Sequence, residues 1–113
     1  MHILVLEDEP LIAVDIAATI ANAGWDVAGP VGSIPKALAM IDKKRCEAAI
    51  LDANLGGASA APVAERLLAC GIPFIVLSGY SDKQLPSPLS GAPFLAKPYD
   101  PEELVALVRS LRR

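Results

Sequence analysis

The sequence has few aromatic residues, few cysteines and no strong excess of one charge. Aromatic side chains make up only 4% of the chain and hydrophobic residues 53%, so a packed core must be built from aliphatic residues and alanine. Lysine and arginine are scattered and the net charge is −3, which argues against a nucleic-acid partner. Cys46 and Cys70 lack the spacing of metal ligands, and we interpret them as small core or surface thiols in a reducing cytoplasm.

Long hydrophobic segments are also missing. The apolar runs are too short to cross a bilayer, and the first residues lack the basic region and long apolar core of a signal peptide. We therefore expect a cytoplasmic protein without a membrane partner. The 113 residues fit one domain, residues 1–113, and nothing follows Arg113, so we expect no output domain in this chain.

Short apolar runs alternate with segments of helical periodicity. The runs predict strands at residues 3–6, 25–31, 48–51, 74–77 and 94–96. The periodic segments predict helices at 10–23, 34–43, from a cap at Ser59 to Gly71, and 101–111. Between 81 and 92, three helix-breaking residues (Pro86, Pro88 and Gly91) predict a fourth helix that is short or absent. The alternation predicts an α/β fold: a doubly wound parallel sheet, flavodoxin-like (βα)5, of strand order 2-1-3-4-5.

Polar residues follow four of the predicted strands. Glu7-Asp8-Glu9 follows the first, and Asp52, Ser78 and Lys97 follow the third, fourth and fifth. The carboxyl ends of parallel strands share one edge of the sheet, and ligands bind there, where the strand order reverses. We therefore expect Asp8 and Asp52 to face each other, with Ser78 and Lys97 closing the same pocket.

This set of residues favours phosphoryl chemistry. Crowded carboxylates repel each other, by about 4 kcal/mol per close pair at an effective dielectric constant of 20, unless a cation lies among them. Mg²⁺ prefers oxygen ligands and often joins one or two carboxylates to phosphate oxygens. Asp52 is the natural nucleophile for an aspartyl-phosphate. The Lys97 ammonium and the Ser78 hydroxyl would then bind the phosphoryl oxygens.

Four motifs in the right order resemble the receiver domains of two-component response regulators. They are Leu6-Glu7-Asp8-Glu9-Pro10, Ile50-Leu51-Asp52-Ala53-Asn54-Leu55, Val76-Leu77-Ser78-Gly79 and Leu95-Ala96-Lys97-Pro98-Tyr99. Because these motifs extend over essentially the whole chain, the resemblance implies a phosphorelay protein, not an enzyme beyond its own phosphorylation and dephosphorylation.

The resemblance also implies roles for single residues. Asp8 and Asp52 would bind Mg²⁺ together with the backbone carbonyl of Asn54, and Glu7 would support the ion through water. Asp52 would receive the phosphoryl group from a sensor histidine kinase or a histidine phosphotransfer protein. Lys97 would contact that group, and its bond to the following proline is commonly cis in this family. A downstream protein would read the phosphorylated state, near 81–92 and the last helix, and we expect a monomer or weak dimer.

The chain departs from the common family pattern at several positions. Ser78 replaces the commoner threonine, Phe94 the commoner tyrosine of an aromatic switch position, and Leu55-Gly56-Gly57 a frequent Met-Pro. The segment 73–80 is similar to the Pro-Phe-x-Phe-Ala-Thr-Gly motif of atypical alphaproteobacterial receivers. By position alone, Asn54 could orient the water that hydrolyses the phosphorylated residue, and Tyr80 could control access to it.

Three other functions are compatible with parts of the pattern. Asp52-Ala53-Asn54 is faintly similar to haloacid-dehalogenase phosphatases, but these need a second aspartate where Asn54 stands and usually a cap domain. Flavin binding on a flavodoxin-like fold needs a phosphate-binding loop where this chain has Glu7-Asp8-Glu9. The main alternative is an interaction module of the same fold that does not use phosphorylation.

Overall fold

Strands and helices alternate along the chain as the sequence predicts. The structure is a computed structural model that describes residues 1–79, 85 and 87–111. Its strands are β1 (His2–Leu6), β2 (Asp26–Val31), β3 (Ala48–Asp52), β4 (Asn54–Leu55), β5 (Ala58–Ser59), β6 (Phe74–Ser78) and β7 (Phe94–Ala96). Its α-helices are α1 (Pro10–Asn22), α2 (Ile34–Asp42), α3 (Ala61–Ala69) and α4 (Pro101–Ser110).

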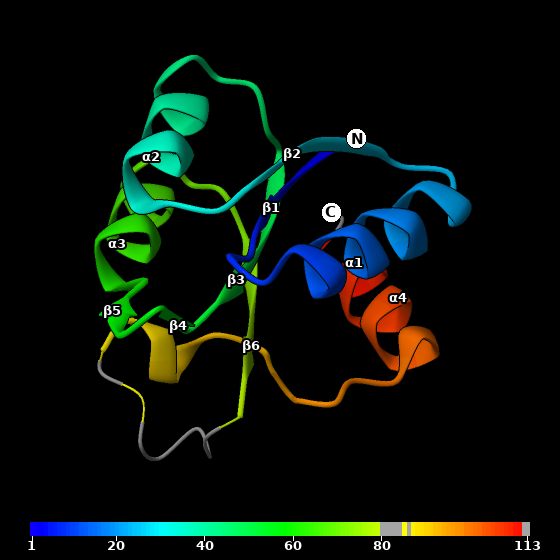
Figure 1. Cartoon of the computed structure of the whole chain (residues 1–113). Helices are drawn as coiled ribbons and strands as arrows, with labels where there is room; N and C mark the ends of the chain where they lie inside the picture. The colour runs from blue at the N-terminus through cyan, green and yellow to red at the C-terminus, as the bar shows by residue number, and fades with distance from the viewer. Residues whose placement is uncertain (80–84, 86, 112–113) are drawn as a thin grey trace.

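The five longer strands form one parallel sheet in the order β2-β1-β3-β6-β7. Helices α1 and α4 cover one face of this sheet, and α2 and α3 cover the other (Figure 1). Numbered by these strands alone, the order is 2-1-3-4-5, so the predicted doubly wound, flavodoxin-like arrangement is confirmed. The order reverses between β1 and β3, which places a crevice at the carboxyl ends of these two strands. In the described part of the chain, no helix is long and apolar enough to cross a membrane.

Two aliphatic cores lie on the two sides of the sheet. Alternate residues of β1 point to opposite faces, so Leu4 and Leu6 pack in the core under α2 and α3, and Ile3 and Val5 in the core under α1 and α4. This burial on both faces explains why the strands are continuous apolar runs. Trp25 is the only tryptophan and closes the end of the second core, with the Arg109 guanidinium 5.9 Å from its ring centroid.

Helix ends follow the capping residues, with one exception. Ser33 and Asp100 cap α2 and α4, and their side chains accept hydrogen bonds from backbone N–H groups of the first turns. The predicted cap of α3 at Ser59 is wrong, because the N-cap is Ala60. Ser59 belongs to β5, and its Oγ accepts the N–H of Ala61 at 3.1 Å. The reason is a small antiparallel hairpin, β4 paired with β5, which the apolar runs of the sequence do not indicate.

The irregular fourth-helix region is confirmed for the residues that the structure describes. Among the described residues between β6 and β7, Leu89–Gly91 forms a 3-10 turn, and none of these residues belongs to an α-helix. Leu89 is fully buried in the core under α2 and α3. Residues 80–84 and 86 lie outside the described part, so the prediction for 81–92 is tested only in its second half.

Candidate functional site

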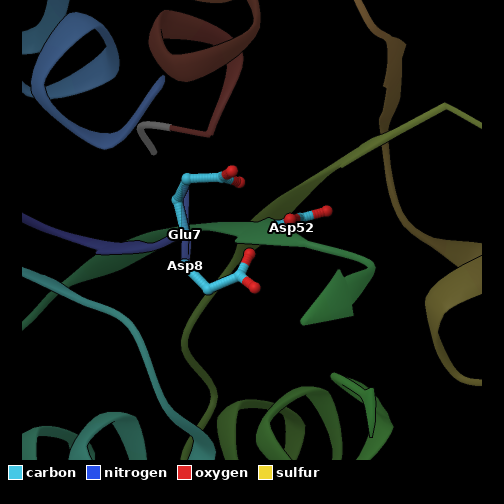
Figure 2. A group of neighbouring side chains, drawn as sticks. All are labelled: Glu7, Asp8 and Asp52. Carbon is cyan, nitrogen blue, oxygen red and sulfur yellow. The ribbon is translucent and has the colours of Figure 1, made fainter. Parts of the chain in front are cut away.

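Three carboxylates meet at the carboxyl ends of β1 and β3. These strands pair in register with Leu6 opposite Leu51, so the next residues, Glu7 and Asp52, lie side by side. One carboxylate oxygen from each of Glu7, Asp8 and Asp52 lies within 4.8 Å of the others. Figure 2 shows Glu7 and Asp8 pointing to opposite sides of the strand end, with the Asp52 carboxylate beside them. Glu7 and Asp52 are buried, and Asp8 is exposed. The sequence-based prediction that Asp8 and Asp52 come together is confirmed.

Lys97 joins the two buried carboxylates. Its Nζ atom lies 3.1 Å from Oε2 of Glu7 and 3.3 Å from Oδ2 of Asp52. Lys97 follows directly after β7, and its backbone N–H donates a hydrogen bond to the carbonyl of Ser78 at 2.9 Å. This bond fixes the backbone of Lys97 beside the end of β6. The Lys97–Pro98 bond is cis, as the family resemblance implied. The ammonium of Lys97 therefore balances part of the negative charge around Asp52.

The charges in this cluster shift two pKa values. Burial of Glu7, followed by the hydrogen bond and repulsion from Asp52, raises the pKa of Glu7 from 4.5 to about 7, although Lys97 acts in the opposite direction. Burial lowers the pKa of Lys97, but attraction to Asp52 and Glu7 outweighs it and the net shift is upward. The raised pKa of Lys97 keeps its ammonium protonated, and the raised pKa of Glu7 makes this carboxyl resist ionisation.

Ser78 and Asn54 lie next to Asp52 along the sheet edge. Asp52 pairs with Leu77 in β6, so Ser78 lies one residue further along the neighbouring strand, and it is buried. The N–H of Asn54 donates to Oδ1 of Asp52 at 3.3 Å. The role of the Asn54 carbonyl as a metal ligand stays a prediction. Phe94 is partly buried against the core under α2 and α3, and Tyr80 lies outside the described residues.

The pairing of Lys97 with Glu7 was not predicted. The family resemblance implies a contact of Lys97 with the phosphoryl group and an indirect, water-mediated role of Glu7 at the metal. Strand alternation carried the missing signal, because it turns Glu7 and Asp8 to opposite sides of the strand end. The side chain at position 7 then points to the side of the sheet covered by α1 and α4 (Figures 1 and 2).

The residues present fit a hard divalent cation. Three carboxylates against one ammonium leave a net charge of −2 in the cluster when all of them are ionised. The donors are all oxygens, as Mg²⁺ requires, and the exposed Asp8 opens the cluster to solvent, from which a hydrated ion could reach it. The same oxygens are poor ligands for softer metals, which prefer thiolate or imidazole.

Comparison with known proteins agrees with this geometry. Residues 3–109 match the family model of the response regulator receiver domain. The chain belongs to this family. Phosphorelay signalling through histidine kinases or phosphotransfer proteins is the general function of receiver domains, and these domains use Mg²⁺.

Several relatives are similar over nearly the whole of this receiver. It is 30% identical over 115 residues to the sensory transduction protein RegX3 of Mycolicibacterium smegmatis, with 98% of this chain and 50% of RegX3 covered. The solution structure of SdrG from Sphingomonas melonis Fr1 is 37% identical, with a TM-score of 0.85 and 98% and 95% of the two chains covered. The anti-anti-sigma factor PhyR from Bartonella quintana is 26% identical, with a TM-score of 0.81 and 95% and 45% covered. This receiver spans about half the length of the curated relatives it matches.

Proposed function

We propose that this receiver accepts a phosphoryl group on Asp52 in a Mg²⁺-dependent reaction and thereby changes its binding to a downstream protein. The donor is a histidine kinase or a histidine phosphotransfer protein. The observation that carries the proposal is the contact of the Asp52 carboxylate with Lys97 on one side and its closeness to Glu7 and Asp8 on the other. In this function the chain is a switch and catalyses only its own phosphorylation and dephosphorylation.

Each residue of the cluster has a part in this reaction. An oxygen of Asp52 attacks the phosphorus atom, and the bond from phosphorus to the donor histidine nitrogen breaks. The Lys97 ammonium, already 3.3 Å from Asp52, stays near the new phosphoryl oxygens and balances their charge. Glu7 keeps Lys97 in place through its own contact at 3.1 Å. Ser78 offers a hydroxyl from the neighbouring strand end.

Asp8, Asp52 and the carbonyl of Asn54 are the groups that would hold Mg²⁺, with Glu7 close by. When bound, the ion supplies positive charge that offsets the charge of the carboxylates and the phosphoryl group. The phosphoryl group adds roughly −1.5 to −2 charges at Asp52, so it stabilises any conformation that brings Ser78 and Lys97 closer to it.

Helix α1 offers a docking face for the protein donor. Leu11 and Val14 are 80% and 65% exposed, and they lie one turn apart on the same side of this helix. A hollow of about 380 Å³ lies between α1 and the segment that follows β7, and Lys97 is the residue of the carboxylate–lysine cluster that lines it. A donor that delivers a histidine to Asp52 must lie close to the first turns of α1. The exposed apolar side chains of this helix therefore suit the phosphoryl donor better than a partner that binds far from Asp52.

Phosphoryl uptake tests the proposed function. Incubation with acetyl phosphate and Mg²⁺ should increase the intact mass by one phosphoryl group, because the small donor supplies the group without a docking partner. EDTA should prevent the increase. An unchanged mass together with no binding in a Mg²⁺ titration would instead support the interaction module that does not use phosphorylation.

Substitution of Leu11 tests the donor surface. The donor is a phosphorylated histidine phosphotransfer domain that labels the unsubstituted chain. Leu11→Gln should slow phosphoryl transfer from this donor at least about tenfold, since an apolar contact of about 1.5 kcal/mol is lost. Labelling by acetyl phosphate should be unchanged. Leu68→Gln is the matched control, because Leu68 is 57% exposed but lies on α3. Equal transfer rates for the two variants would refute the assignment to α1.

A further inference from the structure

The hairpin after Asp52 has a turn made of two glycines. Leu55 pairs with Ala58, so Gly56 and Gly57 are the two residues of the loop. Their φ angles are +58° and +92°, as the tightest hairpin turns require at both central positions. The frequent Met-Pro of related receivers could not form this turn, because proline fixes φ near −65°. The glycines therefore allow a tight β-hairpin to form beside the site.

Hydrogen bonds of Asn54 connect this hairpin to the phosphorylation site. The N–H of Asn54 donates to Oδ1 of Asp52, and its own side-chain Oδ1 accepts the N–H of Gly57 at 2.8 Å. One residue thus connects the proposed nucleophile with the turn. The position of the turn relative to the carboxylates is set by hydrogen bonds at its base and at its tip.

The two glycines differ in what they face. A Cβ atom added at Gly56 would lie 3.4 Å from Oδ2 of Asp8, whereas a Cβ atom added at Gly57 would meet nothing within 4 Å. Only position 56 therefore borders the exposed carboxylate of the acidic cluster. A side chain there would fill the space beside Asp8 and remove solvent from one of its oxygens.

We propose that Gly56 is a positioning residue of the metal site, whose missing side chain keeps the hairpin side of Asp8 open for a hydrated divalent cation. Mg²⁺ loses its waters reluctantly and keeps several of them in protein sites, so it needs free space beside the carboxylate that it binds. Asn54 acts with Gly56, because its hydrogen bond to Gly57 fixes the distance of the turn from Asp8. The inference rests on the proposed function in one respect, that Asp8 and Asp52 hold Mg²⁺.

A matched pair of variants tests this role. Gly56→Ala and Gly57→Ala both place a Cβ atom at a positive φ, so both should lower the free energy of unfolding by a similar amount. Calorimetric titration with MgCl₂ should separate them: we expect the dissociation constant to rise at least fivefold for Gly56→Ala and to stay within twofold for Gly57→Ala. The pair Gly56→Asn and Gly57→Asn repeats the comparison with a residue that tolerates positive φ, in case the alanine variants do not fold.

The outcomes are distinguishable from a failure of the proposed function. If the unsubstituted chain binds Mg²⁺ and both position-56 variants bind it equally well, the role of Gly56 is refuted and the proposed function stands. If position-57 variants lose affinity as strongly as position-56 variants, the effect comes from the turn and not from the space beside Asp8, which also refutes it. A failure of the unsubstituted chain to bind Mg²⁺ would overturn both.

Discussion

Replacing Asp52 with asparagine should abolish phosphoryl uptake. Asparagine keeps the shape of the side chain but its amide is not a nucleophile, so no acyl phosphate can form. After incubation with acetyl phosphate and Mg²⁺, the intact mass of Asp52→Asn should be unchanged while the unsubstituted chain gains one phosphoryl group. The fold should be retained, because Lys97 keeps its contact with Glu7. Mg²⁺ affinity should fall as well, since one of three carboxylates is lost.

A carboxylate elsewhere provides the control. Asp26→Asn makes the same chemical change in an exposed residue that begins β2, at the other edge of the sheet. This variant should be phosphorylated at the rate of the unsubstituted chain. Mass gain in Asp52→Asn, localised to another acidic residue by peptide mapping, would show that Asp52 is not the acceptor. Loss of uptake in both variants would point to a general effect of charge.

The overall fold and the clustering of the site residues could be predicted, because both depend on where the strands begin and end along the sequence. Parallel strands buried on both faces are continuous apolar runs, so their ends are visible in the sequence. Once β1 and β3 are neighbours, Asp8 and Asp52 must lie at the same edge, and Lys97 and Ser78 follow from the same rule. No side-chain detail is needed for this step, only the strand order.

Contacts that depend on local geometry could not be predicted in the same way. Ser59 has the residue type of a helix cap, but the two-residue turn at Gly56 and Gly57 places it in a strand and moves the cap to Ala60. The pairing of Lys97 with Glu7 depends on which side of the strand end each side chain takes, and motif order does not specify this. The first feature affects access to the site, and the second affects its electrostatics.

The contact between Lys97 and two buried carboxylates implies competition between this lysine and the metal. Without a divalent cation, the ammonium is the positive charge that compensates Glu7 and Asp52 in the described cluster. With a cation present, the same carboxylates would be partly neutralised by the ion. Lys97 is then less needed for stability and is available to the phosphoryl group. The lysine therefore has two roles that a single substitution should separate.

Replacing Lys97 with methionine should destabilise the metal-free protein but strengthen metal binding. Removing one partner of a buried ion pair costs about 3 kcal/mol or more, because the remaining charges are left uncompensated. Urea unfolding in EDTA, followed by the fluorescence of the single Trp25, should show this loss at pH 8. The loss should be smaller at pH 6, because the pKa of Glu7 is raised and its protonated form, which needs no partner, is favoured in the folded state.

The same variant should bind Mg²⁺ more tightly and accept phosphate more slowly. The carboxylates no longer have a competing ammonium, so the Mg²⁺ dissociation constant should fall, and saturating Mg²⁺ should restore most of the lost stability. Uptake from acetyl phosphate should nevertheless slow by about 100-fold, since a charged group that stabilises the transferring phosphoryl oxygens is missing. Lys97→Arg keeps the positive charge and should retain the metal-free stability. Weaker Mg²⁺ binding in Lys97→Met would contradict the competition, because it would mean that the lysine holds the carboxylates in place for the ion and does not compete with it.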